Sequence, residues 1–314
     1  MINHPNAGAA LVLGLGCENN TMEGMKALLG HSDTERVKFL ACQDAMDEIE
    51  AALRLLEELV SYAEGFARDD IPTSELVIGL KCGGSDGLSG ITANPLVGVY
   101  TDRLIAEGGT AILTEIPELF GAETILLNRC ENREIFEKTV KLINDFKSYF
   151  TSHGQPIYGN PSPGNKEGGI TTLEDKSLGC AQKAGYATVT DVLKYGERAK
   201  KKGLNLLESP GNDLVSTTAL AVSGAHLVLF TTGRGTPFGS PVPTVKISSN
   251  TQLAKAKRNW IDFDAGGIIA GADIQLLGDT LYELVREIAS GKTLTKTEQF
   301  GIRDLAIFKN GVTL

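Results

Sequence analysis

The sequence predicts an α/β protein with a Rossmann-like parallel sheet domain over residues 1–150 and a second α/β domain over residues 171–314. Short apolar runs alternate with amphipathic helical patterns in the first half, which is typical of βαβ units and a parallel sheet. Residues 151–170 are rich in Gly, Pro, Asn and Ser, so we expect a linker loop there. A chain of 314 residues has room for two such domains.

Four apolar runs of the first half are expected to be buried strands. They cover residues 9–15, 37–41, 76–80 and 111–113. The clearest helix is expected over 46–63, where apolar residues recur at steps of three and four. Two further helices are expected over about 95–107, which a Gly-Gly pair ends, and over 132–150.

The second half of the chain has fewer helical patterns. Capping-box matches that begin at Thr171 and Thr280 predict one helix each. The apolar run 226–232 predicts a buried strand that ends at a glycine-rich turn containing Arg234. A charge that leaves a buried strand between two glycines needs an anion as its partner, so Arg234 is a candidate carboxylate-binding residue. No assignment follows for residues 300–314.

The composition argues against several classes of protein. The net charge is −9 and no long basic run occurs, so binding to nucleic acid or to an anionic membrane is not expected. No apolar stretch is long enough to span a bilayer, and the first residues do not resemble a signal peptide. Five cysteines without a Cys-x-x-Cys pair favour a reducing, cytoplasmic location over a disulfide framework or a structural zinc site.

A glycine-rich turn follows the expected strand at 76–80 and precedes a helix. It reads Lys81-Cys82-Gly83-Gly84-Ser85-Asp86-Gly87-Leu88-Ser89-Gly90. Ligands of open α/β sheets bind outside the carboxyl ends of the strands, and glycines let the backbone approach a ligand closely. The turn is therefore a candidate binding site, although a plain strand-to-helix turn explains the glycines equally well.

Several thiols and ionisable side chains stand at the ends of the expected strands. They are Cys17, Glu18, Cys42, Lys81, Cys82, Asp86 and Glu115. If all these strands are parallel and share one sheet, these residues meet at one edge and form a metal or acid–base site. The alternative, that cysteines near strand ends are buried apolar residues, is favoured for Cys42 and stays open for Cys17 and Cys82.

The longer motifs resemble the altronate dehydratase/galactarate dehydratase family over nearly the whole chain. The motifs are His4-Pro5-Asn6, Gly14-Leu15-Gly16-Cys17-Glu18, Gly79 to Asp86, Gly90 to Pro95, Glu115-Ile116-Pro117-Glu118, Asn160 to Lys166, Gly211-Asn212-Asp213, Thr231 to Gly239 and Gly311 to Leu314. The resemblance implies a hydro-lyase that removes water from a sugar acid to give a 2-keto-3-deoxy acid, with Fe²⁺ or another divalent ion such as Mn²⁺.

Sulfolactate sulfo-lyase is a related activity of the same family. Longer members carry further parts before the His4-Pro5-Asn6 point, so the resemblance also implies either a fragment or a chain that works with a separate small subunit. A sugar-acid-binding subunit without turnover therefore remains an alternative, and a homo-oligomer is one form of assembly left open.

The chemistry of dehydration suggests roles for the candidate residues. We expect Cys17, Glu18 and Cys82 to bind the metal, because thiolates suit Fe²⁺ better than Mg²⁺. Either Lys81 or Lys166 would take the carbon proton, and either Glu115 or Asp86 would protonate the departing hydroxyl. The residues expected to bind the substrate are Gly83, Gly84, Ser85, Asn165, Thr232 and Arg234.

Overall fold

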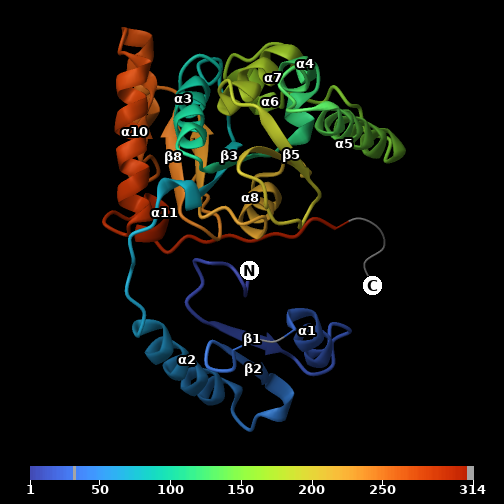
Figure 1. Cartoon of the computed structure of the whole chain (residues 1–314), viewed down its shortest axis with the longest axis vertical. Coiled ribbons are helices and arrows are strands. Elements are labelled where there is room, and N and C mark those ends of the chain that lie inside the picture. The colour runs from blue at the N-terminus through green and yellow to red at the C-terminus, as the bar shows by residue number, and fades with distance from the viewer. Residues whose placement is uncertain (31–32, 310–314) are drawn as a thin grey trace. The chain divides into compact units, whose positions relative to one another are not determined.

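The computed structural model describes residues 1–30 and 33–309 and divides the chain into two compact units, Met1–Asp70 and Ile71–Leu314. Figure 1 shows both units, with the first in the blue tones of the N-terminal residues. Among the described residues no helix is both long and apolar enough to cross a membrane.

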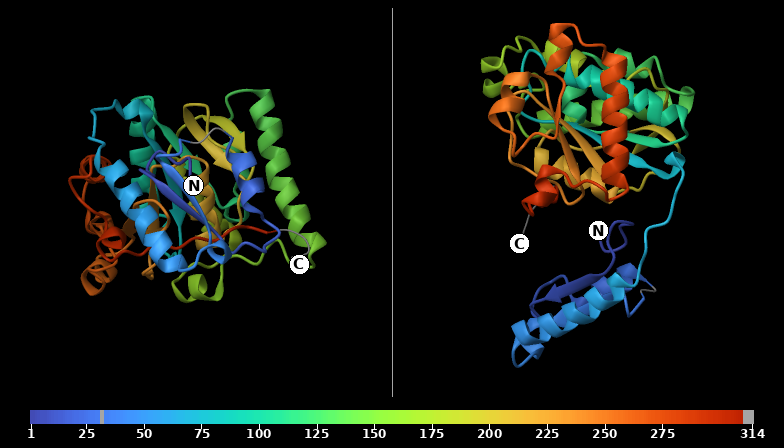
Figure 2. Two further views of the ribbon diagram at one scale, coloured as in Figure 1. Left: turned by 90° about the horizontal axis from the view of Figure 1, so that it is seen from below. Right: turned by 90° about the vertical axis from the view of Figure 1, so that its left-hand side faces the viewer.

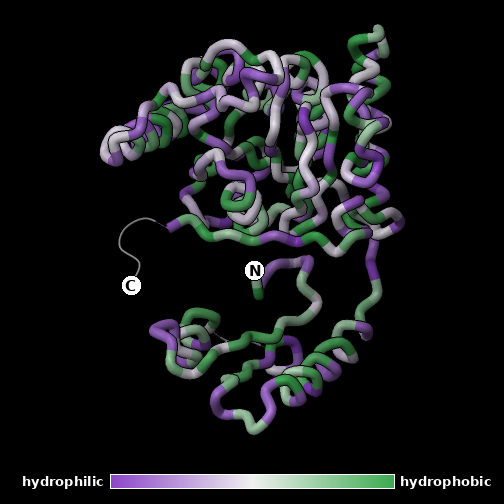
Figure 3. The backbone as a smooth tube through the Cα atoms, turned by 180° about the vertical axis from the view of Figure 1, so that it is seen from behind, coloured by the Kyte–Doolittle hydropathy of each residue, from purple (hydrophilic) through white to green (hydrophobic). Residues whose placement is uncertain are grey.

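The first unit is built on two parallel strands, β1 (Ala10–Gly14) and β2 (Val37–Ala41). Its helices are α1 (Met22–Leu29) and α2 (Glu48–Glu64), and a short 3₁₀ turn covers Cys42–Asp44. The Asp47 side chain caps α2 by accepting a hydrogen bond from the Glu50 N–H. Hydrophobic and hydrophilic residues alternate along α2 in Figure 3, so the amphipathic helix expected over 46–63 is confirmed.

The second unit is built on a parallel sheet of seven strands in the order β5-β6-β4-β3-β7-β8-β9. The strands are β3 (Val77–Cys82), β4 (Thr110–Leu113), β5 (Val189–Leu193), β6 (Gly203–Leu207), β7 (Leu227–Thr232), β8 (Thr244–Ser248) and β9 (Phe263–Asp264). The inner strands are buried on both faces, which explains why they read as continuous apolar runs. The α/β class and the parallel sheet are therefore confirmed.

Helices cover both faces of this sheet (Figures 1 and 2). They are α3 (Ala93–Ala106), α4 (Glu123–Leu127), α5 (Arg133–Ser152), α6 (Pro163–Glu167), α7 (Leu173–Ala181), α8 (Asp213–Val222), α9 (Thr251–Ala256), α10 (Ile274–Ala289) and α11 (Lys296–Gln299). Four 3₁₀ turns cover Thr73–Glu75, Ile116–Leu119, Gln182–Ala184 and Gly266–Ala270. The larger core packs α3, α5 and α10 against one face, and α8 closes a smaller core on the other.

The division of the chain differs from the one expected. Strand β3 pairs with β7, and β4 pairs with β6, so strands from before and after residues 151–170 share one sheet. The stretch 151–170 has the composition of a linker, but it contains α6, which Ser162 caps by accepting from the Asn165 N–H. The boundary lies instead near residue 70, where the first unit ends.

Candidate active site

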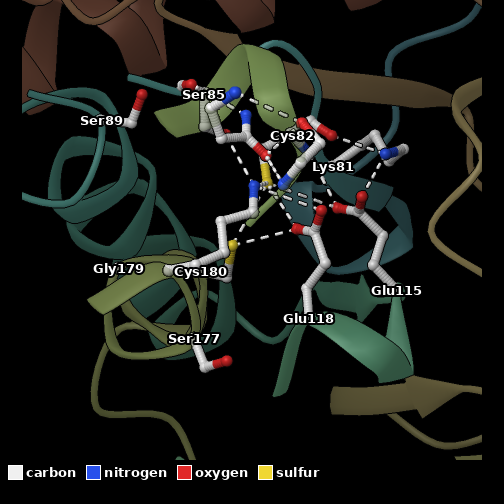
Figure 4. A network of polar contacts seen from close by, with 12 residues as sticks. Lys81, Cys82, Ser85, Ser89, Glu115, Glu118, Ser177, Gly179 and Cys180 are labelled. Atoms are coloured by element: carbon white, nitrogen blue, oxygen red, sulfur yellow. Dashed lines mark hydrogen bonds and ion pairs between the residues drawn. The ribbon is translucent and has the colours of Figure 1, made fainter. Parts of the chain in front are cut away.

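Ionisable side chains gather beyond the carboxyl ends of β3 and β4, at the centre of the seven-stranded sheet. Lys81 and Cys82 are the last two residues of β3, and both are fully buried. Glu115 follows β4 in the left-handed region, with φ of 68°, which turns its side chain toward β3. The Cys82 N–H donates to Glu115 Oε2 at 2.9 Å, so the two strand ends are tied together (Figure 4).

All three protons of the Lys81 ammonium are used in hydrogen bonds. They go to the carbonyl of Cys82 at 2.5 Å, to Asp213 Oδ1 at 2.8 Å and to Glu115 Oε1. Burial by itself would lower the pKa of Lys81, but the charges of Glu115 and Asp213 outweigh it and raise the pKa above its ordinary value. Lys81 is therefore a fixed cation that holds Glu115 and Asp213 in place, although burial, followed by the charge of Cys82, raises the pKa of Glu115 well above its ordinary value.

Two thiols and a carboxylate form a compact group beside Lys81. Glu118 Oε2 lies 3.0 Å from Cys82 Sγ and 3.0 Å from Cys180 Sγ, and the two sulfur atoms are 3.5 Å apart. All three residues are buried, and one ligand atom from each lies within 4.8 Å of the others. We call Cys82, Glu118 and Cys180 the thiol–carboxylate group (Figure 4).

Two further buried lysines surround the thiol–carboxylate group. Lys183 Nζ lies 2.8 Å from Cys82 Sγ and 3.5 Å from Glu115 Oε2. Lys176 Nζ donates to Ser85 Oγ at 3.0 Å and lies 3.2 Å from Glu118 Oε1. The negative charges of the group outweigh the burial of both lysines and raise the pKa of each, so both carry a charge at neutral pH.

The same contacts shift the pKa values of the two thiols, Cys82 and Cys180, in opposite directions. The pKa of Cys82 is held well below its usual range, and the largest cause is a hydrogen bond from the Cys180 thiol. The charges of the nearby ammonium groups act in the same direction, and together they outweigh burial, which raises the pKa. That hydrogen bond and burial raise the pKa of Cys180. Burial, and then the charge of Cys82, also raise the pKa of Glu118. The site therefore pairs a thiolate with a thiol and a carboxyl that holds its proton more tightly than usual.

The thiol–carboxylate group fits a soft divalent cation. Two sulfur atoms and one carboxylate oxygen suit iron or another transition metal and do not suit Mg²⁺, which prefers oxygen ligands. Cys82 and Glu118 line a cavity that leaves room for further ligands, and ammonium groups favour the thiolate form that a metal requires. Among the described His, Cys, Asp and Glu residues, these three have ligand atoms close enough to one another to hold a single metal ion.

A polar cavity of about 400 Å³ opens onto this group. Besides Cys82 and Glu118, its lining includes Gly83, Gly84, Asn160, Asn165, Lys176, Asp213 and Arg234. A smaller cavity of about 180 Å³ is also lined by Lys176, together with Cys180 and Asp86 among others. The larger cavity has the size and polarity for a small hydroxylated acid.

The structure brings many of the predicted site residues to this cavity. Gly83, Gly84, Asn165 and Arg234 line it, which the sequence analysis expected of substrate-binding residues. Ser85 is not among the lining residues of this cavity, but it contacts one of them: the Asn165 side-chain amide donates to the Ser85 carbonyl at 2.9 Å. Arg234 donates to Glu167 Oε2 at 2.9 Å, so its charge is already paired at the cavity edge.

Three other predicted residues lie near the cavity without lining it. Asp86 accepts hydrogen bonds from Ser249 at 2.7 Å and Asn250 at 3.1 Å, so it ties the glycine-rich turn to the loop after β8. Thr232 is buried and accepts from the Gly235 N–H at 2.9 Å. Lys166 is exposed on α6. The roles first given to Asp86, Thr232 and Lys166 remain untested predictions.

Cys17 and Glu18 lie in the first unit, after β1. Glu18 is half-buried and accepts hydrogen bonds from the N–H groups of Leu15 and Gly16, while the exposed Cys17 accepts at Sγ from Gln43 Nε2 at 3.4 Å. The expectation that all the strands share one sheet is wrong, because β1 and β2 pair only with each other. Whether Cys17 and Glu18 bind a metal stays a prediction.

Five residues of the site had no role among those predicted from the sequence, although Glu118 and Asp213 stand in the motifs that carry the family resemblance. The five are Glu118, Lys176, Cys180, Lys183 and Asp213. The signal for three of them was present: Lys176, Cys180 and Lys183 follow at steps of four and three, which places them on one side of α7 and the turn after it. Glu118 stands three residues after Glu115 on a 3₁₀ turn, where side chains at that spacing align.

A parallel sheet whose central strands end in a buried ionisable group beside a polar cavity defines an α/β protein with an enzyme-type ligand site. The chain belongs to the D-galactarate/altronate dehydratase family. Residues 73–313 match the family model described as "D-galactarate/Altronate dehydratase, C-terminal". Residues 1–64 match the model described as "D-galactarate dehydratase/Altronate hydrolase, second domain", so the two matches coincide with the two structural units.

Individual relatives agree with this assignment. The chain is 60% identical over its full length to altronate dehydratase of Bacillus subtilis and 57% identical to altronate dehydratase of Escherichia coli. It is 34% identical, over 97% of its length, to galactarate dehydratase (L-threo-forming) of Escherichia coli. The chain spans 63% of the length of each altronate dehydratase and 61% of the galactarate dehydratase.

Proposed function

We propose that this chain is the catalytic portion of a dehydratase that converts altronate to a 2-keto-3-deoxy acid and water. The observation that carries the proposal is the buried thiol–carboxylate group, ringed by lysines, that faces a polar cavity of about 400 Å³. Two altronate dehydratases among its relatives support altronate as the substrate.

The reaction needs three groups. A base takes the proton from the carbon beside the carboxylate, an acid or a metal assists the departing hydroxyl, and a positive charge stabilises the carboxylate as it gains enolate character. The resulting enol then becomes the keto acid by losing its hydroxyl proton and taking up a proton at the neighbouring carbon. Each of these groups has to reach the cavity, which limits the candidates.

Asp213 is the base that the geometry supports. It is one-third exposed, lines the cavity and is held by Lys81 at 2.8 Å. Lys81 and Lys166 were the bases expected from the sequence, but the ammonium of Lys81 has no free electron pair and donates all its protons. In this proposal Lys81 and Glu115 are positioning residues that act through Asp213 and Cys82.

Lys176 is the acid that the geometry supports. Its charged ammonium lines the cavity 3.2 Å from Glu118, and the surrounding negative charges keep it protonated. A proton from Lys176 neutralises the hydroxide as the carbon–oxygen bond breaks. Asp213 then gives the proton it has taken to bulk water, and bulk water returns one to Lys176, so both groups are restored. Glu115, a candidate acid in the sequence analysis, is buried away from the cavity lining.

We further propose that Cys82, Glu118 and Cys180 hold a divalent metal, with Fe²⁺ preferred over Mn²⁺ because two of the three ligands are sulfur. When bound, the metal supplies a Lewis acid for the substrate oxygens. The protein residues keep their roles beside it: Lys183 stabilises the Cys82 thiolate, and Lys176 positions Glu118.

The paired state of Arg234 supports a substrate with a single carboxylate. Its guanidinium is neutralised by Glu167 at 2.9 Å, so the far end of the cavity offers hydrogen bonds and little net charge. Altronate presents a neutral hydroxyl end there, whereas galactarate would present a second carboxylate beside Glu167. The pair therefore favours the monocarboxylate.

An anaerobic assay with Fe²⁺ tests the proposed activity. Altronate should yield a 2-keto-3-deoxy acid, and Asp213→Asn should lower kcat by about 10²- to 10⁴-fold, the range for loss of a general base. The matched control is Asp145→Asn on the surface of α5, which should leave turnover unchanged. If no product forms, either with the chain alone or with the separate small subunit that the family resemblance implies, the proposal is overturned in favour of a binding subunit. Release of sulfite from sulfolactate would replace it with the sulfo-lyase activity.

A cobalt titration tests the metal ligands without turnover. Co²⁺ bound by thiolates gives a ligand-to-metal charge-transfer band, which Cys82→Ser and Cys180→Ser should each weaken or abolish. Cys17→Ser should leave the band intact, because Cys17 belongs to the first unit and not to the thiol–carboxylate group. Loss of the band in Cys17→Ser, with retention in Cys180→Ser, would return the assignment to the ligands first expected from the sequence.

A further inference from the structure

Another cavity lies at the opposite edge of the same sheet, where the strands begin. It has a volume of about 430 Å³, and its lining includes Val77 and Thr110, the first residues of β3 and β4. The thiol–carboxylate group starts at Cys82, at the other end of β3. At about 3.3 Å per residue, a strand of this length separates the two sites by roughly 17 Å.

The lining of this amino-edge cavity is strongly basic. Four cations from one short segment contribute to it: Arg198, Lys200, Lys201 and Lys202. Lys202 has a carboxylate beside it, at 3.4 Å from Glu75, while Lys201 donates to the carbonyl of Thr190 and its charge acts on Glu134. Over the part of the chain that the structure describes, no ion pair within 4.0 Å involves Arg198 or Lys200. In a chain of net charge −9, four neighbouring cations, of which Arg198 and Lys200 have no ion pair among the described residues, attract an anion.

A buried serine in the same lining lacks a hydrogen-bond partner. Ser223 is 1% exposed, and its hydroxyl has no partner among the described residues. A buried hydroxyl left without a hydrogen-bond partner is destabilising, so a ligand oxygen that accepts from Ser223 would be favoured there. The carbonyl of Ser223 accepts from the Ala199 N–H at 3.0 Å, which fixes the basic segment against the end of α8. The serine and the cations therefore belong to one preformed wall.

We propose that the amino-edge cavity binds a small anion that carries phosphoryl groups. A guanidinium and several ammonium groups provide more positive charge than one carboxylate would use, and phosphoryl oxygens accept from guanidinium, ammonium and hydroxyl groups alike. The volume exceeds what a single orthophosphate fills, so a ligand with two linked phosphoryl groups fits better. The inference is independent of the dehydratase proposal, because none of its residues belongs to the thiol–carboxylate group or its cavity.

Calorimetric titration of the full chain with pyrophosphate tests the proposal, and orthophosphate distinguishes a single phosphoryl group from a linked pair. We expect pyrophosphate to bind with a dissociation constant of about 1 mM or below. Arg198→Glu/Lys200→Glu should weaken that affinity at least about tenfold, because two attractive contacts become repulsive. Ser223→Ala should cause a smaller loss, of about two- to fivefold.

The matched control is Arg258→Glu/Lys292→Glu, which makes the same charge change at exposed positions outside this cavity. It should change the pyrophosphate affinity less than about twofold, because screened charges far from a site contribute little. An equal loss in both double variants would overturn the proposal, as would the absence of binding up to about 10 mM. Binding that survives Arg198→Glu/Lys200→Glu but disappears in Lys176→Met would move the anion to the candidate active site.

Discussion

Positively charged side chains lie in different environments at the two edges of the seven-stranded sheet, the edge where the strands end (the carboxyl edge) and the edge where they begin (the amino edge). At the carboxyl edge Lys81 and Lys183 are buried, and each lies against a carboxylate or a thiolate. At the amino edge Arg198 and Lys200 are exposed, and the described residues give them no ion pair. A buried ion is stable only with its partner, whereas an exposed ion is stabilised by water. The carboxyl edge is therefore an interdependent network, and the amino edge is a set of independent charges available to a ligand.

Replacement of one buried lysine should give the largest effect on stability. Lys183→Met leaves Cys82 and Glu115 without a cation that they share, and loss of a buried partner costs about 3–5 kcal/mol. Lys200→Met at the amino edge should change the free energy of unfolding by less than about 0.5 kcal/mol. Urea unfolding followed by the fluorescence of Trp260, the single tryptophan, measures both in the second unit.

A double variant separates the loss of charge pairing from the loss of packing. If the cost of Lys183→Met arises from the unpaired thiolate, Cys82→Ala in the same chain should recover at least about 1 kcal/mol of it. Additive effects of the two substitutions would contradict the picture of an interdependent network at the carboxyl edge.

The ionisation of Cys82 should make the carboxyl edge sensitive to pH. The folded chain holds the pKa of Cys82 below its usual range, while the unfolded chain has a thiol pKa of about 8.5. Between these two values the unfolded state binds more protons, so the contribution of Cys82 to stability rises with pH through this window. It is complete above the unfolded pKa and is lost as the pH falls through the folded pKa.

Ultraviolet absorbance of the thiolate measures this directly. At neutral pH the folded chain should show one thiolate band that Cys82→Ser removes and Cys130→Ser leaves in place. The same band should shrink in Lys183→Met, because the ammonium at 2.8 Å is one of the groups that lower the pKa of Cys82. A band that appears only above the ordinary thiol range would contradict the assignment.

A smaller effect should come from the close packing of the glycine-rich turn. A Cβ at Gly83 would lie 2.5 Å from the Phe230 ring and 2.6 Å from Asp213 Oδ2, so Gly83→Ala forces the proposed base to move. Overpacking of this kind costs about 1–3 kcal/mol. Gly211 lines the same cavity, and a Cβ there would meet nothing within 4 Å. Gly211→Ala should therefore stay within about 0.5 kcal/mol of wild type in the Trp260 unfolding assay.

The sequence predicted the half of the site that follows from strand order. Lys81, Cys82 and Glu115 end two apolar runs, and parallel pairing of neighbouring strands brings such ends together. The same reasoning failed for Cys17, because local patterns do not reveal that β1 and β2 form a separate sheet. Sheet membership is decided by long-range pairing, and no motif in the sequence encodes it.

The half of the site supplied by α7 was beyond prediction for a related reason. The spacing of Lys176 and Cys180 indicates one helix face, but the direction of that face depends on how the helix docks on the sheet. Helix ends were also misplaced where two signals competed: Thr280 lies inside α10, which begins after an Asp273 cap. The sequence therefore predicted the helices and strands themselves, but it did not predict how the helices pack on the sheet.

The smallest expected effect concerns an exposed ion pair at the carboxyl edge. Arg234 and Glu167 are 43% and 70% exposed, so their pair resembles the charges of the amino edge more than Lys81, and its loss should cost under about 1 kcal/mol. Glu167→Gln nevertheless frees the charge of Arg234 toward the cavity. Under conditions that give turnover, the ratio of kcat/KM for galactarate to that for altronate should rise about two- to fivefold, which is the rate equivalent of that energy. Glu137→Gln, which breaks a surface Arg–Glu pair on α5, should leave the ratio unchanged. An unchanged ratio in Glu167→Gln would mean that the paired state of Arg234 does not set the preference for a monocarboxylate, and the carboxyl edge would then select its substrate through the buried network alone.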